Sequence, residues 1–239
     1  MCGRFVLATS VPEIASLFNA TFEPRIAESV IPSWNVPPTE TIPAIVDDKD
    51  GERRLRLYRW GLVPPWAKGL SFGANTINAR AESIATKASF RTPFRSQRCI
   101  IPADGYYEWK TTPGEVRQPY YFTRSNLEPL AFAGLWEAWR SPQIGAEDAG
   151  VIYTCAIVTT DANEDVEAIH TRMPVILEND GTLERWLDSD LHDGNELQAM
   201  LTPARSGTLA RRRVGTAVGS VRNNRPDLVA EELVNPGLF

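Results

Sequence analysis

The sequence predicts an α+β fold: a single domain on a strongly bent, barrel-like, mainly antiparallel β-sheet with flanking short helices. Short segments with strand patterns fill the middle of the chain, proline-rich loops separate them, and few segments carry a helical pattern. With 239 residues, of which 43% are hydrophobic and 23% charged, the chain fits one medium domain with a substantial core. We find no internal repeat and no dividing linker, so we expect one domain over residues 2–239.

The first expected element is a short amphipathic helix over residues 11–18, where apolar residues recur at helical spacing and Pro12 suits the first turn. An extended segment at 34–39 then leads to a strand at 42–46, which ends at a turn over 47–51. Residues 54–60 alternate polar and apolar side chains, as a half-buried strand does. The strand before the turn is its expected partner.

Further elements follow from the same patterns. Strands are expected at 99–102, 106–109, 119–122, 130–136 and 154–158. Helices are expected at 81–88, 165–169, 183–187 and 195–201. The final stretch, residues 214–239, keeps apolar side chains at intervals, so we expect it to dock on the domain.

Composition limits the class of protein. The net charge of −5 and the pI near 5.2 argue against a protein that coats duplex DNA by bulk electrostatics. A local basic groove remains open, because arginine is concentrated in two runs, although such runs are most often solvated faces. The two runs are Arg91, Arg95 and Arg98, and then Arg211, Arg212 and Arg213.

The chain start and the cysteines indicate a compartment. The first residues lack a signal-peptide pattern, and no apolar stretch approaches about 20 residues. We therefore expect a cytoplasmic protein with no membrane partner. Cys2, Cys99 and Cys155 are odd in number and show no paired spacing, which suits free thiols. Neither a disulfide framework nor a metal site is indicated.

Cys2 is the first candidate for chemistry. The chain opens Met1-Cys2-Gly3-Arg4, and a small residue after the initiator allows Met1 to be removed. Cys2 would then carry an α-amine and a thiol on adjacent carbons, with ordinary pKa values of about 7.7–8.0 and about 8.5. Such a 1,2-aminothiol condenses with an aldehyde through nitrogen and closes through sulfur to a five-membered thiazolidine. A chance cysteine in a frayed chain start explains the residue equally well.

Two further segments suit the binding of a polar ligand. In an extended segment Asn78 and Arg80 project to one side, and an amide beside a guanidinium suits a phosphate. A surface strand leading into a capped helix accounts for the same residues. Trp66 follows the rigid Pro64-Pro65, where it could stack on an exposed base, although a tryptophan is more often a packing residue.

Two titratable residues suit proton transfer. Glu108 lies in a segment with three aromatic residues, and apolar surroundings raise the pKa of a carboxyl group. An exposed glutamate on an edge strand is the competing interpretation. His170 stands two residues before Arg172, which could bind an anion beside the imidazole. A lone histidine is more often a structural hydrogen-bonding residue, and His192, in an Asp-rich loop, fits ordinary surface.

Five separated motifs change this balance when they are taken together. In chain order they are MCGR at 1–4, WGL at 60–62, NAR at 78–80, ADGYYEW at 103–109 and HTRMP at 170–174. Their order and spacing resemble the SOS response-associated peptidase family, also called abasic-site processing proteins. The resemblance runs from Cys2 to at least Leu177, and residues 214–227 look like the closing segment of the family.

The resemblance implies a protein that guards abasic sites in single-stranded DNA. The ring-opened abasic sugar is an aldehyde, so the Cys2 α-amine would form a Schiff base with C1′ and the thiol would close a thiazolidine. The product is a stable DNA–protein crosslink. The family name also implies a Cys2-dependent removal of Met1. The implied partner is single-stranded DNA with abasic sites, bound by a monomer that needs no metal and no cofactor.

The resemblance also assigns catalytic roles. Glu108 matches the carboxylate that moves protons during ring opening and amine attack. His170 matches the histidine that helps Schiff-base formation and reversal of the crosslink, and Asn78 matches the residue that positions Cys2 and the sugar. The DNA-binding residues implied are Arg80 and Arg172 on phosphates, with Arg4, Trp66 and Trp109 completing the DNA face.

Two other functions remain open on the residues alone. One is a cysteine peptidase in which the Cys2 thiol attacks an amide, with His170 and Glu108 completing the set. The other is a non-catalytic single-strand binding module that uses Trp66, Trp109 and the arginines.

Overall fold

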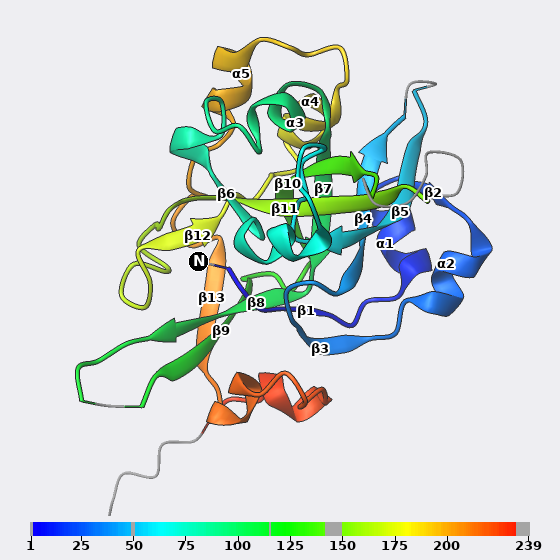
Figure 1. Cartoon of the computed structure of the whole chain (residues 1–239). Coiled ribbons are helices and arrows are strands. Elements are labelled where there is room, and N and C mark those ends of the chain that lie inside the picture. Colours follow the sequence, from blue (N-terminus) through cyan, green and yellow to red (C-terminus); the bar gives the residue numbers. More distant parts are fainter. Residues whose placement is uncertain (1, 49–50, 115, 142–149, 233–239) are drawn as a thin grey trace, which may run out of the picture.

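Five strands close into a barrel at the centre of the computed structural model (Figure 1). The structure describes residues 2–48, 51–114, 116–141 and 150–232. In their order around the barrel the strands are β11 (Ile152–Asp161), β10 (Leu130–Trp139), β7 (Arg98–Ala103), β4 (Thr41–Asp47) and β5 (Arg53–Trp60). Neighbours pair antiparallel except β5 and β11, whose parallel pairing sets Trp60 opposite Cys155. The predicted barrel-like, mainly antiparallel sheet is confirmed.

Strand pattern explains how the barrel packs. The predicted pairing across the 47–51 turn is confirmed, with Ile45 opposite Leu55, while residues 49–50 of that turn lie outside the described residues. Apolar strands β7 and β10 are buried over most of their length, as strands covered on both faces are. The Trp60 ring lies 5.1 Å from the Phe5 ring, centroid to centroid. The chain start therefore packs directly on the barrel.

A second, five-stranded antiparallel sheet carries the chain start. Its order is β13 (Leu209–Arg213), β9 (Gln118–Arg124), β8 (Gly105–Lys110), β1 (Phe5–Leu7) and β3 (Ser33–Val36). β1 pairs with β8 with Phe5 opposite Tyr106, and the Tyr107 N–H donates to the Arg4 carbonyl at 2.9 Å. Asp104 accepts from the Thr9 N–H at 3.0 Å, which fixes the far end of β1. Residues 2–4 are thus held beside β8.

Three short strands flank the barrel. They are β2 (Thr21–Phe22) on β5, β6 (Asn78–Arg80) parallel to β11, and β12 (Arg172–Pro174) antiparallel to β11. With two or three residues each, they are too short for the sequence pattern alone to establish them as strands. Two of them bring predicted site residues to β11.

Short helices lie around the two sheets. They are α1 (Val11–Leu17), α2 (Pro24–Ser29), α3 (Arg91–Ser96), α4 (Thr182–Leu187) and α5 (Gly194–Ala199), with 3₁₀ turns η1 (Leu70–Asn75), η2 (Ala81–Ser83), η3 (Thr216–Gly219) and η4 (Pro226–Val229). α1, α4 and α5 confirm three predicted helices, and a capping box between Ser10 and Glu13 begins α1. None of the helices in the described part of the chain has the length and apolar character needed to cross a membrane.

Two predicted helices are wrong. Over 81–88 the chain forms only η2 and then turns, because hydroxyl side chains compete for the backbone: Thr86 Oγ1 donates to the Ser83 carbonyl at 3.2 Å. Over 165–169 the chain forms turns, since Asn163 Oδ1 accepts from the Asp165 N–H at 3.2 Å. The helix that the first pattern missed, α3, begins after these turns.

The C-terminal segment lies against the second sheet as far as it is described. Val218 and Leu228 are buried in a small cluster with Val6 and Tyr107. Asn35 Nδ2 donates to three carbonyls of the segment, at Val218 (3.3 Å), Ser220 (3.0 Å) and Asn223 (2.7 Å). Residues 233–239 of the expected docked stretch lie outside the described residues.

Candidate functional site

Cys2 is buried where the two sheets meet. The residue is fully buried and belongs to the main core cluster. Its carbonyl accepts a 2.8 Å hydrogen bond from Asn78 Nδ2, so strand β6 holds the main chain of Cys2 in place. The frayed-terminus interpretation is therefore wrong for Cys2. Met1, whose removal was expected, lies outside the described residues.

Glu108 is a buried carboxylate on the same side of β8 as the Tyr106 ring. It is only 2% exposed, so the interpretation as an exposed edge residue is wrong. Burial first, and the Glu108 carboxylate second, raise the pKa of the Cys2 thiol well above its ordinary range. At neutral pH this thiol is protonated. The site therefore pairs a neutral sulfur with a buried carboxyl group.

Asn78 presents an open acceptor beside Cys2. Its Nδ2 is used by the Cys2 carbonyl, whereas Oδ1 is buried and accepts no hydrogen bond within the described residues. An unsatisfied buried acceptor costs about 1–3 kcal/mol, so it calls for a functional explanation. Two residues further along β6, beyond buried Ala79, Arg80 is exposed. The alternation predicted for this segment is confirmed.

His170 and Arg172 are joined by a local hydrogen bond. The Arg172 N–H donates to His170 Nδ1 at 2.9 Å, which leaves the proton of the neutral ring on Nε2. The Arg172 guanidinium donates to Glu82 Oε1 at 2.6 Å, to Asp161 Oδ1 at 2.7 Å and to the Thr159 carbonyl at 2.8 Å. Any anion that reaches Arg172 must compete with these two carboxylates.

Strand β11 lies between the two short strands that carry predicted site residues, β6 and β12. Thr159 on β11 stands opposite Arg80 on β6, while Asp161 pairs with Arg172 on β12. The structure thus groups Cys2 with Asn78 and Glu108, and sets the Arg80 and Arg172 strands on either side of one β11 segment. His170 is tied to this group through Arg172.

Trp66 lies on a rigid loop after β5. Its side chain is 58% exposed, and its ring packs edge-on to Phe72 with centroids 5.0 Å apart. The loop is fixed at its base because Gly61, at φ +128°, approaches Gly73 so closely that a Cβ on Gly61 would lie 2.6 Å from the Gly73 carbonyl oxygen. A hollow of about 560 Å³ opens beside Trp66. An exposed aromatic face on a rigid loop can stack on a base.

Arg4 and Trp109 lie together next to the C-terminal segment. Arg4 Cζ stands 5.9 Å from the Trp109 ring centroid. Arg4 Nη1 donates to Asn35 Oδ1 at 2.7 Å and to the Val218 carbonyl at 3.0 Å. Trp109 is half-buried and tilted against Tyr107 at 6.4 Å. Arg4 therefore also fastens the C-terminal segment.

Three polar residues of this region were not predicted from the sequence. Tyr106 and Thr159 carry buried hydroxyls that have no hydrogen-bond partner within the described residues, and Asn35 is 2% exposed. The one signal in the sequence is a pair of threonines, Thr159 and Thr160, near the end of the mainly apolar β11. Within the described residues no three His, Cys, Asp or Glu side chains gather to hold a metal ion.

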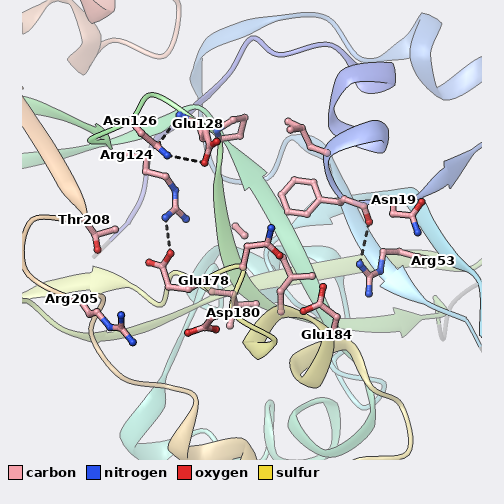
Figure 2. Close-up of a pocket in the computed structure, with 17 residues that line it drawn as sticks. Asn19, Arg53, Arg124, Asn126, Glu128, Glu178, Asp180, Glu184, Arg205 and Thr208 are labelled. Atoms are coloured by element: carbon pink, nitrogen blue, oxygen red, sulfur yellow. Dashed lines mark hydrogen bonds and ion pairs between the residues drawn. The ribbon is translucent and has the colours of Figure 1, made fainter.

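A cavity of about 610 Å³ opens elsewhere, and none of the predicted site residues lines it (Figure 2). Two of its arginines are bonded within it: Arg124 pairs with Glu178 at 2.7 Å, and Arg53 donates to the Phe18 carbonyl at 3.1 Å. Both carboxylates and guanidiniums line it. It lacks a nucleophile and is separate from the Cys2 site.

Solved structures share this fold. A protein from Bacteroides thetaiotaomicron superposes with a TM-score of 0.84 at 24% identity, covering 97% of this chain and 100% of the other. A protein from Bordetella bronchiseptica gives a TM-score of 0.72 at 25% identity, over 90% and 100% of the two chains. These likenesses confirm the single-domain α+β fold.

Sequence relatives identify the family. The family model for the SOS response associated peptidase matches residues 1–221. The protein named abasic site processing protein YoqW from Bacillus subtilis is 41% identical over 96% of this chain and 99% of its own length. The abasic site processing protein HMCES of Gallus gallus is 35% identical over 86% of this chain and 68% of its own length. The chain belongs to the SOS response associated peptidase family.

Proposed function

We propose that this protein captures abasic sites in single-stranded DNA as a covalent thiazolidine crosslink through Cys2. The observation that carries the proposal is a buried Cys2 whose carbonyl is held by Asn78 at 2.8 Å and whose thiol faces the charge of a buried Glu108. Relatives named for abasic site processing support the lesion as substrate. The protein acts as a cytoplasmic monomer, without metal or cofactor.

Removal of Met1 comes first. Hydrolysis of the Met1–Cys2 peptide bond consumes one water and turns the Cys2 nitrogen into a free α-amine. We assign this step to the protein itself, dependent on Cys2. Asn78, whose Nδ2 holds the Cys2 carbonyl, also carries Oδ1, a buried acceptor that has no partner within the described residues and is available to the new amine. A hydrogen bond between them would hold the amine lone pair in one direction.

The amine attacks before the sulfur. Since the pKa of the buried thiol is raised, the sulfur is protonated at neutral pH, whereas an α-amine with a pKa near about 7.7–8.0 is partly neutral. The nitrogen bonds to C1′ of the ring-opened sugar, and the carbinolamine loses water to give an imine. The Cys2 sulfur then bonds to C1′ and its proton passes to the nitrogen. The ring closes with one water lost and no oxidant.

Glu108 and His170 move the protons. Because the charge of the buried Glu108 carboxylate acts on the Cys2 thiol, we assign to Glu108 the transfer of the ammonium proton to the departing hydroxyl. His170, with its neutral-ring proton on Nε2, assists Schiff-base formation and the reversal of the crosslink. Holding amine, thiol and aldehyde together can supply about 7–11 kcal/mol of the barrier.

The DNA strand is held by the surrounding residues. Arg80 is exposed and free to bind a phosphate, whereas Arg172 shares its guanidinium with Glu82 and Asp161. Trp66, which is 58% exposed, stacks on a base, and the Arg4–Trp109 pair completes the DNA face.

A denaturing gel tests the proposal. Wild-type protein mixed with single-stranded DNA that contains one abasic site should give a band that survives boiling in detergent. Cys2→Ala should give no such band, and Cys2→Ser should give at most an imine that disappears unless it is reduced. An undiminished stable band in Cys2→Ala would overturn the proposal.

The two other functions are less well supported. A cysteine peptidase acting on other proteins needs a thiolate, and the burial of Cys2 disfavours that form. A non-catalytic single-strand binding module gives no role to a carboxylate that is 2% exposed beside Cys2. Equal binding of intact and abasic DNA, with no adduct, would favour that module.

A further inference from the structure

The two arginine runs of the sequence differ in whether their guanidiniums have hydrogen-bond partners. In the later run the Arg211 guanidinium donates to the Asp165 carbonyl, Arg212 to the Val229 carbonyl, and Arg213 to Glu232. The guanidiniums of that run are therefore already bonded within the fold. In the earlier run the side chains of Arg91 and Arg95 are exposed, and neither guanidinium has a hydrogen-bond or ion-pair partner within the described residues.

Arg91 and Arg95 border a hollow of about 580 Å³. The other side chains that line it are Ala85 and three hydroxyl residues, Thr86, Thr92 and Ser96. No carboxylate is among its lining residues. The hollow therefore offers two guanidiniums and the Thr92 hydroxyl to an anion, in a protein whose net charge is −5, because the Thr86 and Ser96 hydroxyls already donate to backbone carbonyls.

The helix that carries the two arginines is firmly anchored. Arg98 is 5% exposed, and its guanidinium donates to the Arg95 carbonyl at 2.7 Å, the Phe94 carbonyl at 3.2 Å and the Trp186 carbonyl at 2.7 Å. These bonds tie α3 to α4. Arg91 and Arg95 stand one turn apart on α3, where two like charges repel each other. A bound anion would remove that repulsion.

The hollow follows the Cys2 site directly along the chain. Arg80 ends β6, which holds Cys2, and residues 81–90 run from it into α3. Figure 1 shows the chain leaving β6 and reaching α3 on the side of the barrel where α4 and α5 lie. A strand of DNA that passes Arg80 on this side is thus led toward a second cluster of positive charge.

We propose that the hollow between Arg91 and Arg95 binds a backbone phosphate of the DNA strand that flanks the abasic site, several nucleotides from the lesion. This inference rests on the proposed function, because it extends the DNA path of the same site. The hollow adds length to the footprint on one side of the lesion only. It contributes affinity for the strand and takes no part in the covalent steps.

Reversible binding tests the inference. The probe is single-stranded DNA with a tetrahydrofuran analogue of the abasic site, which has no aldehyde and cannot crosslink. Three oligonucleotides are compared. The first has a long flank only on the 5′ side of the lesion, the second has a long flank only on the 3′ side, and the third is short on both sides. Arg91→Gln combined with Arg95→Gln should weaken binding about fivefold at ~0.1 M salt and lower the salt slope by about 0.7, the value for one phosphate contact on a single strand.

That loss should occur with one of the two long flanks and vanish with the short oligonucleotide. The matched control is Arg25→Gln combined with Arg205→Gln, which removes the same charge from two other exposed arginines. An equal loss in the control, or a loss that persists with the short oligonucleotide, would overturn the inference. Binding of inorganic phosphate can be followed by its competition with DNA. A double variant that no longer binds phosphate yet keeps its DNA affinity would also overturn the inference.

The outcome is separable from that of the proposed function. The tetrahydrofuran probe measures strand binding without the covalent steps, so a failure to crosslink leaves this measurement intact. Conversely, a protein that crosslinks normally but shows no flank dependence contradicts the inference alone.

Discussion

Two regions of this protein each bury a thiol, a carboxylate and a tyrosine hydroxyl, but they differ in what surrounds these groups. The first region holds Cys2, Glu108 and Tyr106, and the second, around the β10–β11 pairing, holds Cys155 and Tyr58, with Glu137 on the opposite face of the sheet from Cys155. Both thiols are fully buried, and both tyrosine hydroxyls have no hydrogen-bond partner within the described residues. Burial alone does not distinguish a reactive region from a structural one.

The difference lies in how each carboxylate is used. Glu137 Oε1 accepts from Gln97 Nε2 at 3.0 Å and from the Ala138 N–H at 2.9 Å, and burial alone raises the pKa of the Cys155 thiol. In the first region the Glu108 charge adds to burial in raising the pKa of the Cys2 thiol. A buried carboxylate whose charge acts on the thiol distinguishes the first region from the second.

Removing each thiol in turn should give the largest contrast. Cys2→Ala is expected to abolish the stable adduct, because neither the sulfur nor the ring it closes remains. Cys155→Ala is expected to keep the crosslinking rate within about twofold and to lower the free energy of unfolding by about 1–2 kcal/mol through the small cavity it leaves. Gel kinetics and urea unfolding measure the two effects. Equal loss of crosslinking in both variants would break the comparison.

The carboxylates should differ next. Glu108→Gln keeps the size of the side chain but cannot take a proton, so we expect the crosslinking rate to fall by about 10²–10⁴. Glu137→Gln should leave the rate unchanged, since this carboxylate serves Gln97 and the backbone. Single-turnover kinetics with an abasic oligonucleotide decide. A Glu108→Gln rate close to wild type would remove the proton-transfer role.

The free energy of unfolding should fall at alkaline pH because the thiols are buried. The folded-state pKa of Cys155 is raised by burial, whereas the unfolded thiol ionises near its ordinary pKa of about 8.5. The unfolded chain therefore loses a proton that the folded chain keeps, so this stability is fully present below about pH 8.5 and is lost as the pH rises. Each such thiol steepens the loss by about 1.4 kcal/mol per pH unit. Urea unfolding from pH 8 to 10.5 should show a shallower decline in Cys155→Ala; an unchanged slope would contradict the assignment.

The smallest effects are expected at the tyrosine hydroxyls. Tyr58→Phe and Tyr106→Phe each remove a buried hydroxyl that has no hydrogen-bond partner within the described residues, while the rings keep their contacts with Trp136 and Phe122. We expect the free energy of unfolding to stay level or rise by up to about 1 kcal/mol in both variants. Thermal or urea unfolding checks this. A loss above about 1 kcal/mol would mean that the hydroxyl has a partner in solution.

Much of the barrel could be predicted because its strands are long enough to show a pattern. Segments such as β5 and β10 have eight and ten residues, and their apolar side chains mark them clearly. β6 and β12, with three residues each, form only because β11 is there to pair with them. Local polar bonds also overrode helical spacing, as at Thr86 and Asn163.

The residue types of the site could be predicted, but its geometry could not. Resemblance to a family pointed to Cys2, Asn78 and Glu108, which lie far apart in the sequence. Their meeting depends on β1 pairing with β8 and on the bond from Asn78 to the Cys2 carbonyl. The pairing of Arg172 on β12 with Glu82 in η2 likewise joins residues 90 positions apart in the sequence, and no local pattern indicates it.

The central claim is that the nitrogen and the sulfur of Cys2 are both used. Intact-mass measurement after reaction with an abasic oligonucleotide tests this most directly. The account predicts a protein that has lost Met1 and gained the mass of the oligonucleotide less one water, in an adduct that persists without reductant. No adduct, an adduct on a chain that still carries Met1, or the same stable adduct in Cys2→Ala would contradict it.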